Sequence, residues 1–285
     1  MSLTTPDFLI IGAPKCGTTS LSNALSRHPE IYIPPIKEVG FFSNDKNWQK
    51  GREWYASYFE DAEPDMVVGE ASPQYLRAPD APECINCVCP GARFIALVRD
   101  PVERARSHYW FRRWGGTESR PLREAFEEEL DRFPNWKEED YLLPPGFYAE
   151  HLDRYVQCFG RDRLLVISLS RLSSSPQDVL SNVQRFLGVS VCSLKLDRNN
   201  PSSAPRSQVY RDFVQYLVKS QGIVKSLVKS VATYSTRRRI RKTLHSLNVK
   251  EKEKPPLPEG IRKSLISIYY KNMIKMEDKF GVKLD

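Results

Sequence analysis

The stretch that decides the fold lies at residues 7–20 and has the sequence DFLIIGAPKCGTTS. Its apolar run at residues 8–11 is followed by a loop of small and cationic residues and then by a helical pattern. An unbroken apolar run predicts a strand buried on both faces, which is typical of a parallel sheet. Glycines 12 and 17 allow backbone N–H groups to close around an anion at the positive end of the following helix. The stretch therefore predicts a phosphate-binding turn.

The loop differs from the nucleoside-triphosphate loop G-x-x-x-x-G-K-[ST] in the place of its lysine. Its glycines have the required separation, but Thr18 follows the second one, and Lys15 lies inside the loop. A lysine in that place faces an anion near the middle of the loop, not the last phosphate of a triphosphate. The loop therefore suits a shorter anion. A glycine-containing turn of a general α/β protein is the simpler alternative.

The string K-x-G-T-T-S at residues 15–20 resembles the 5′-phosphosulfate-binding loop of the sulfotransferases. The resemblance implies 3′-phosphoadenosine 5′-phosphosulfate (PAPS) as the sulfuryl donor. It also implies a set of donor-binding residues, of which Lys15 has a catalytic role as well: Lys15, Cys16, Gly17, Thr18, Thr19 and Ser20. We expect no metal, because Lys15 and the helix terminus supply the positive field.

A second segment, KEVGFF at residues 37–42, resembles the segment that supplies the catalytic base in the heparan-sulfate branch of that family. By position, Glu38 inherits the role of general base; the alternative is a solvated loop carboxylate. The chain departs from that branch at Gly40, where a histidine is usual. Glu70, at the end of an expected strand at residues 66–70, is the second candidate base, and a structural ion pair is its alternative. Ala71 replaces the lysine that follows in the heparan-type string.

The apolar run at residues 92–98 predicts a further strand, which delivers Arg99 at its carboxyl end, where open α/β sheets contact their ligands. Asp100 and Pro101 are typical of an N-cap and a first helical position. An arginine here favours a direct grip on a phosphate, whereas a nucleotide kinase would place a metal-binding carboxylate there. R-D-P followed by Ser107 resembles the 3′-phosphate motif of the sulfotransferases, which assigns Arg99 and Ser107 to that phosphate. Arg206, in a later polar loop, is a candidate second contact.

The chain has 285 residues, of which 40% are hydrophobic and 27% charged, enough for a substantial core. We expect one domain over residues 1–285. No run of about 18 apolar residues occurs, and the N-terminus lacks a signal-like pattern, so we expect a soluble, cytoplasmic protein, either whole or a catalytic fragment of a larger chain. Its six cysteines are scattered, which favours reduced thiols. The cluster Cys84, Cys87 and Cys89 has no fourth zinc ligand nearby, so we expect a local disulfide or a surface loop.

The net charge of +8 is concentrated in one segment. Residues 219–254 contain eleven Lys or Arg and two Glu, a net charge of +9, which leaves 32 basic against 33 acidic residues elsewhere. Interleaved apolar residues predict a basic amphipathic helix there. Such a helix could contact an anionic membrane or an acidic partner, form a lid over the site, or present a solvated face.

Together, the segments predict an α/β fold with a P-loop-like central parallel sheet of about five strands and helices on both faces. The function expected is in-line sulfuryl transfer from PAPS to a hydroxyl or amine of a carbohydrate or small molecule, without nucleic acid as a partner. The alternatives are a nucleotide kinase on a related fold and a non-catalytic protein that binds anions or membranes.

Overall fold

The computed structural model describes residues 3–137, 140–197, 203–205, 249–251 and 253–284. The chain falls into two compact units. The first comprises residues 1–108, 121–199 and 257–285, and the second comprises residues 109–120 and 200–256. The predicted sheet and both predicted phosphate-binding motifs belong to the first unit.

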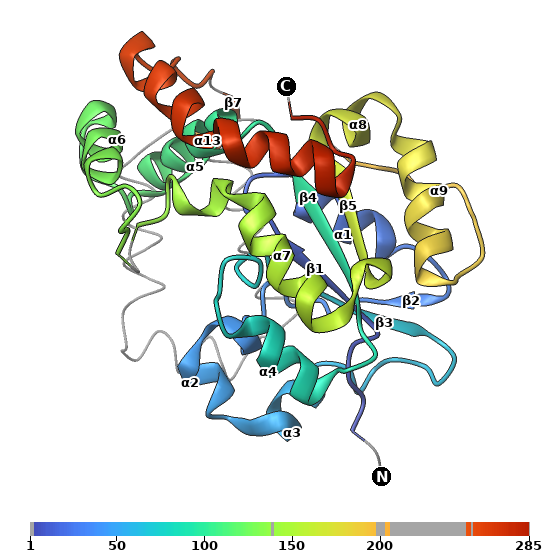
Figure 1. Cartoon of the computed structure of the whole chain (residues 1–285). Helices are drawn as coiled ribbons and strands as arrows, with labels where there is room; N and C mark the ends of the chain where they lie inside the picture. Colours follow the sequence, from blue (N-terminus) through green and yellow to red (C-terminus); the bar gives the residue numbers. More distant parts are fainter. Residues whose placement is uncertain (1–2, 138–139, 198–202, 206–248, 252, 285) are drawn as a thin grey trace. The chain divides into compact units, whose positions relative to one another are not determined.

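The first unit is built on a parallel sheet of five strands in the order β2-β3-β1-β4-β5 (Figure 1). The strands are β1 Phe8–Gly12, β2 Ile31–Tyr32, β3 Val67–Ala71, β4 Arg93–Val98 and β5 Leu164–Ser168. Strand β1 lies at the centre, paired with β3 on one side and β4 on the other, and all five of its residues are buried. This arrangement confirms the predicted fold, because an apolar run with no polar face can be satisfied only inside a sheet covered on both sides.

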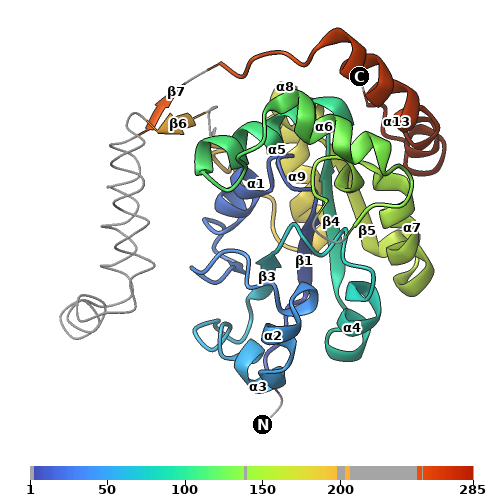
Figure 2. The same ribbon diagram turned by 90° about the vertical axis from the view of Figure 1, so that its left-hand side faces the viewer.

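Helices α4 and α7 lie on one face of this sheet, and helices α1 and α9 lie on the other (Figure 2). The described helices are α1 Thr18–Leu25, α2 Asp45–Trp48, α3 Gly51–Ala56, α4 Ala81–Val88, α5 Pro101–Gly115, α6 Leu122–Asp131, α7 Tyr148–Phe159, α8 Leu169–Ser174, α9 Pro176–Leu187 and α13 Glu259–Phe280. Three short 3-10 helices, η1 Phe41–Ser43, η2 Pro144–Gly146 and η3 Arg161–Arg163, lie between them. Helix α9 is capped at its C-terminal end by Gly188, which has a left-handed conformation.

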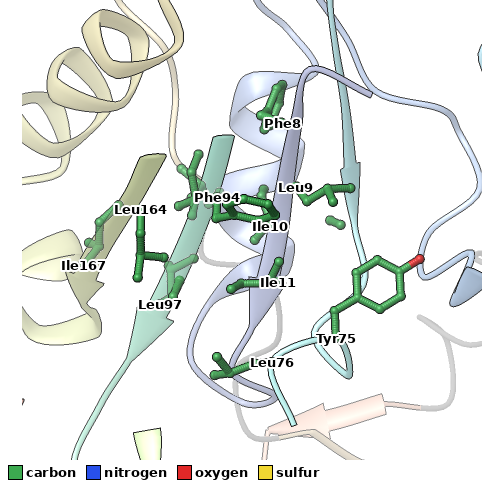
Figure 3. Packing of buried hydrophobic residues seen from close by; sticks show 14 of the residues in the cluster. Phe8, Leu9, Ile10, Ile11, Tyr75, Leu76, Phe94, Leu97, Leu164 and Ile167 are labelled. Carbon is green, nitrogen blue, oxygen red and sulfur yellow. The ribbon is translucent and has the colours of Figure 1, made fainter. Parts of the chain in front are cut away.

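The part of the core shown in Figure 3 is formed by apolar side chains from β1, β4 and β5 together with the turn that follows β3. Phe8 is fully buried beside Gly69 of the neighbouring strand. A Cβ atom at Gly69 would lie only 2.1 Å from Cζ of the Phe8 ring, so only glycine leaves room for this aromatic ring. The close approach fixes how β1 and β3 pack, and thereby places the ends of both strands beside each other.

The C-terminal helix α13 packs on α7 and α6. The hydroxyl of Tyr269 donates to the carbonyl of Leu143 (2.8 Å), and Lys279 forms an ion pair with Asp153 (2.7 Å). The residues of α13 that are buried recur at helical spacing, among them Ile261, Leu265 and Tyr269. Among the described residues, no helix is long and apolar enough to cross a membrane.

The second unit contains a small antiparallel pair, β6 Ser203–Pro205 and β7 Val249–Glu251. The basic segment at residues 219–254 lies in this unit. Its predicted helix does not extend to residues 249–251, because these pair as a strand. Residues 219–248, and with them most of the expected helix, lie outside the described residues.

The cysteine cluster differs from its expectation. Cys84 and Cys87 lie within α4, and Cys89 follows its end, so the segment is a helix and not a surface loop. All three thiols are free, which makes a local disulfide wrong. In the described part of the chain, no group of His, Cys, Asp and Glu side chains is arranged to hold a metal ion.

Candidate active site

The loop between β1 and α1 has the backbone geometry of an anion cradle. Gly17 is the N-cap of α1 and has a φ angle of 91°, and Lys15 is also left-handed at 71°. The first bond of the helix runs from the N–H of Leu21 to the carbonyl of Gly17 (3.1 Å), so the N–H groups of the turn before Leu21 point out of the start of the helix. A Cβ at Gly17 would lie 2.9 Å from Cδ1 of Leu169, which restricts this position to glycine. Such a turn presents N–H groups and the helix dipole to an anion.

The side chain of Cys16 faces the protein interior. Its Sγ atom lies 3.7 Å from the hydroxyl of Tyr148, and its N–H donates to the carbonyl of Ala13 (3.2 Å). Burial raises the pKa of the Cys16 thiol to about 11, although the positive charges of Arg104, Arg99 and Lys15 lower it. Cys16 therefore packs beneath the loop. The lowering of its pKa by three cations shows that their positive charges lie near the loop.

The second predicted phosphate-binding motif lies at the end of β4, the strand next to β1. Asp100 Oδ1 accepts the N–H of Glu103 (2.5 Å), so Asp100 caps α5 as its sequence predicts. Arg99 is partly exposed, and its guanidinium lies 3.8 Å from the carboxylate of Glu103. That separation exceeds a hydrogen bond, so this ion pair holds Arg99 weakly. Ser107 is buried further along the same helix.

The candidate base Glu38 lies in the loop after β2, and its φ angle of 61° is left-handed. Its carboxylate pairs with the ammonium of Lys37 (3.0 Å) and accepts a hydrogen bond from the side chain of Gln74 (3.3 Å). Lys37 Nζ also donates to the hydroxyl of Thr19 in the anion cradle. Two segments that lie apart in the sequence, at residues 12–20 and 37–42, are thereby brought into contact. A left-handed non-glycine residue is typical of functional sites.

Glu70 has a different environment, because only 1% of its surface is exposed. Its carboxylate accepts hydrogen bonds from the hydroxyls of Tyr55 (2.8 Å), Tyr75 (2.9 Å) and Ser72. Burial raises the pKa of Glu70 above its usual value, while hydrogen bonds from Ser72, Tyr55, Tyr75 and the Val39 backbone lower it. A carboxylate enclosed by three hydroxyls has no face left for an acceptor. Of the two candidate bases, Glu38 is therefore the one that an acceptor can reach.

The sequence analysis did not predict the contacts of Lys37 and Gln74. It also did not predict that two charged side chains, those of Arg104 and Glu129, bind the backbone of the segment before α7. Glu129 accepts the N–H groups of Leu142 (3.0 Å) and Leu143 (2.9 Å), and Arg104 donates to the carbonyl of Leu142. The signal available in the sequence was a charged residue on an otherwise apolar helix face.

Arg206, the candidate second contact to a 3′-phosphate, lies outside the described residues.

The Sulfotransferase domain family matches residues 5–276, so the chain belongs to this family. Three curated relatives show the similarity at the level of sequence. The mouse bifunctional heparan sulfate N-deacetylase/N-sulfotransferase 4 is 36% identical over 199 residues, which cover 65% of this chain and 22% of the relative. The human bifunctional heparan sulfate N-deacetylase/N-sulfotransferase 3 is 32% identical over 238 residues, covering 79% of this chain and 26% of the relative. The mouse heparan sulfate glucosamine 3-O-sulfotransferase 5 is 30% identical over 187 residues, covering 65% and 54%.

These alignments are partial on the side of the relatives. The chain spans 22% of the length of the first N-deacetylase/N-sulfotransferase and 54% of the 3-O-sulfotransferase. The match therefore concerns one part of each relative.

Solved structures share the fold. The sulfotransferase from Alicyclobacillus acidocaldarius superimposes with a TM-score of 0.71 at 24% identity, covering 99% of this chain and 98% of that chain. The mouse sulfotransferase SULT7A1, solved in complex with PAP, has a TM-score of 0.50 at 14% identity, covering 97% and 89%. Similarity at these identities establishes the architecture of the chain.

Proposed function

We propose that this chain transfers a sulfuryl group from PAPS to a hydroxyl or amine of a carbohydrate or small-molecule acceptor. One observation carries the proposal: an anion cradle at the end of β1 lies beside an arginine at the end of β4, the adjacent strand. Two neighbouring anion sites match a nucleotide that has one anionic group on its 5′ carbon and another on its 3′ carbon.

The residues of the cradle fit the 5′ end of this donor. The N–H groups of Gly17, Thr18 and Thr19 and the hydroxyls of Thr18, Thr19 and Ser20 would hold its 5′-phosphate, and Arg99 with Ser107 would hold its 3′-phosphate. The donor supplies an activated sulfuryl group. Lys15 neutralises the negative charge that grows on the bridging oxygen as the sulfur–oxygen bond to the phosphate breaks.

Glu38 removes the proton of the acceptor as its oxygen or nitrogen bonds to sulfur. Such a general base contributes roughly 10²–10⁴-fold in rate when it is well placed. The contacts of Lys37 with both Glu38 and Thr19 support this role, because they hold the carboxylate at the edge of the cradle. The Glu38 side chain is also 39% exposed, so an acceptor can reach it.

The names of the relatives bear on the acceptor. Both groups of relatives are named for heparan sulfate, one for N-sulfation and the other for 3-O-sulfation of glucosamine. We therefore place an amino-sugar polysaccharide first among the acceptors to be tested. Small hydroxylated molecules are tested second. They stay in the test because the histidine usual in the heparan-sulfate branch is replaced by Gly40, which weakens the inference of a sugar acceptor.

Calorimetric titration with nucleotides tests the donor. We expect adenosine 3′,5′-bisphosphate to bind, adenosine 5′-phosphate to bind more weakly, and ATP with Mg²⁺ to bind weakly or not at all. At a hundredfold excess over Kd, binding should stabilise the fold by about 2.7 kcal/mol. Tighter binding of ATP with Mg²⁺, or binding of anionic vesicles without any nucleotide binding, would contradict the proposal.

Transfer itself is measured with ³⁵S-labelled PAPS. The acceptors are an unsulfated heparan backbone, the same backbone with free amines, and a panel of small alcohols and phenols. Label is expected on at least one class of acceptor, and Lys15→Ala should lower the rate of labelling by about 10²–10³-fold. Tight nucleotide binding without transfer to any acceptor would contradict the enzymatic part of the proposal.

A further inference from the structure

We propose that Glu70 is a positioning residue that fixes the loop carrying Glu38 through the hydroxyls of Ser72 and Tyr75. This inference rests on the proposed function, since it takes Glu38 as the general base. It assigns to the buried carboxylate of β3 a part in the reaction that requires no contact with the donor or the acceptor.

Two hydrogen-bond relays connect Glu70 to the backbone of the loop. In the first, Ser72 Oγ donates to Glu70 Oε1 and accepts the N–H of Gly40 (3.0 Å). In the second, the Tyr75 hydroxyl donates to Glu70 Oε2 (2.9 Å) and accepts the N–H of Phe41 (2.9 Å). The Tyr75 hydroxyl points away from β1 (Figure 3). Each hydroxyl has a single hydrogen atom, which it donates in a hydrogen bond to the carboxylate. A lone pair on the hydroxyl oxygen is then left to accept the backbone N–H of the loop.

A carboxylate suits this place because it only accepts hydrogen bonds. It receives three hydroxyl donors, those of Ser72, Tyr75 and Tyr55. A side-chain amide would turn its own N–H groups toward one of them and release that hydroxyl from its orientation. Leaving a buried hydroxyl unpaired is costly, so the three hydroxyl donors favour an ionised carboxylate here, and they oppose the effect of burial on its pKa.

The loop needs such restraint because its backbone is unfavourable. Glu38 and Gly40 both have left-handed φ angles, 61° and 65°. For a residue with a side chain, such as Glu38, that conformation is unfavourable. The N–H of Glu38 donates to the carbonyl of Ala71 (3.2 Å), and the side chain of Asn47 donates to the carbonyl of Val39 (2.9 Å). With the two relays, every residue at 38–41 is tethered, mainly to the end of β3 and the turn after it.

The inference differs from a purely structural role in what it predicts for the rate. A structural carboxylate would affect stability and leave the catalytic step unchanged in the molecules that remain folded. A positioning carboxylate affects kcat through Glu38, because misplacing a reacting group by about 1 Å can cost 10²-fold. The effect should also vanish when Glu38 can no longer act as a base.

The chain offers a matched pair of substitutions. Tyr75→Phe and Tyr55→Phe each remove a fully buried hydroxyl that donates to Glu70 Oε2, at 2.9 and 2.8 Å. Only the hydroxyl of Tyr75 also accepts an N–H from the loop. The two variants therefore lose the same chemical group from the same carboxylate, and they differ in the relay.

The experiment measures kcat at saturating donor and acceptor, the Kd for adenosine 3′,5′-bisphosphate, and Tm. We expect Tyr75→Phe and Ser72→Ala each to lower kcat roughly 10-fold, with the Kd within about twofold, and Tyr55→Phe to lower kcat no more than about threefold. Glu70→Gln should lower kcat further than either single relay variant. In a Glu38→Gln background, Tyr75→Phe should change the residual rate by less than about twofold, because coupled residues are not additive.

Two results would overturn the inference alone. One is an equal fall in kcat for Tyr75→Phe and Tyr55→Phe, and the other is the same fall from Tyr75→Phe with and without Glu38. Full turnover in Glu38→Gln would instead overturn the assignment of the base in the proposed function. If the Glu70 variant does not fold, the relay variants still decide the question, since each keeps the carboxylate.

Discussion

The loop at residues 12–20 and the loop at residues 37–42 are shaped in contrasting ways. The backbone turn of the first is formed between near neighbours, because the N–H of Cys16 donates to the carbonyl of Ala13 and Gly17 supplies the left-handed turn, while the N–H of Ala13 and the side chains of Cys16 and Thr19 contact more distant residues. The second is held from a distance: Gly40 bonds to Ser72, 32 residues away, and Phe41 bonds to Tyr75, 34 residues away. The contrast suggests that a donor loop can be carried by a short motif, whereas an acceptor-side loop depends on the surrounding fold.

Glu38→Gln separates the two loops most strongly. We expect kcat to fall by roughly 10²–10⁴-fold, because the amide cannot accept the proton of the acceptor. The Kd for adenosine 3′,5′-bisphosphate should stay within about twofold, since the donor loop keeps its shape. Steady-state kinetics with labelled PAPS and calorimetry give the two numbers. A loss of donor affinity equal to the loss of rate would show that the loops do not act separately.

Lys15→Ala is the corresponding change on the donor side. It removes the cation that opposes charge on the leaving phosphate, so we expect kcat to fall by about 10²–10³-fold. Lys37→Ala serves as the comparison, since Lys37 contacts Thr19 and Glu38 but lies outside the cradle. Its effect should be smaller. The same fall in kcat for both variants would assign the leaving-group charge to Lys37 as well.

Arg99→Ala should act on donor binding. Loss of a charged hydrogen bond to phosphate costs about 1.5–3 kcal/mol, which corresponds to roughly 10–150-fold in Kd. Arg99→Lys should recover part of the affinity, because an ammonium keeps the charge and loses the bidentate geometry. Adenosine 5′-phosphate, which has no 3′-phosphate, should bind the wild type and both variants alike. Equal losses for both nucleotides would place Arg99 elsewhere along the donor.

Gly17→Ala tests how strictly the left-handed turn of the donor loop requires glycine. The substitution puts a side chain at a φ of 91° and 2.9 Å from Leu169, so we expect a loss of about 1–2 kcal/mol in the free energy of unfolding. Gly281→Ala is the control, because Gly281 is also left-handed at 66° and has nothing within 4 Å of a built Cβ. Urea denaturation should show a smaller loss there, and only Gly17→Ala should weaken nucleotide binding.

The smallest effect concerns thiol chemistry under the donor loop. With a pKa raised to about 11 by burial, Cys16 is ionised to about one part in a thousand at pH 8. Cys87, on the exposed side of α4, should react with iodoacetamide far faster. Peptide mass spectrometry over time measures both rates, and denaturation should make them similar. Equally fast labelling of the two thiols in the native protein would show that the loop opens readily.

The parts of the fold that were predicted correctly rest on contiguous patterns. Runs of apolar residues identified the strands expected at residues 8–11, 66–70 and 92–98, and short motifs identified the turn before α1 and the capped helix that follows Arg99. These signals are local, because a strand buried on both faces and a left-handed turn each restrict the residues that form them. The residues proposed to bind the donor belong to this category, and their roles remain predictions.

The parts that could not be predicted depend on contacts between distant residues. Glu70 was identified as a polar strand end, but its three hydroxyl partners come from α3 and from the turn after β3. The helix that holds Cys84 and Cys87 was missed, because a cysteine-rich string carries little helical preference. The hydrogen-bond partners and the exposure of these residues depend on segments that meet only in the folded chain, so a local sequence pattern does not predict them.

The order of strands β3, β1 and β4 has a consequence for how the chemistry of this chain could diverge in evolution. Each of the three adjacent strand ends borders a different part of the proposed reaction. Deprotonation of the acceptor lies near β3, departure of the phosphate lies at β1, and recognition of the ribose phosphate lies at β4. Substitutions near β3 can therefore select a new acceptor while the residues at β1 and β4 continue to bind the same nucleotide.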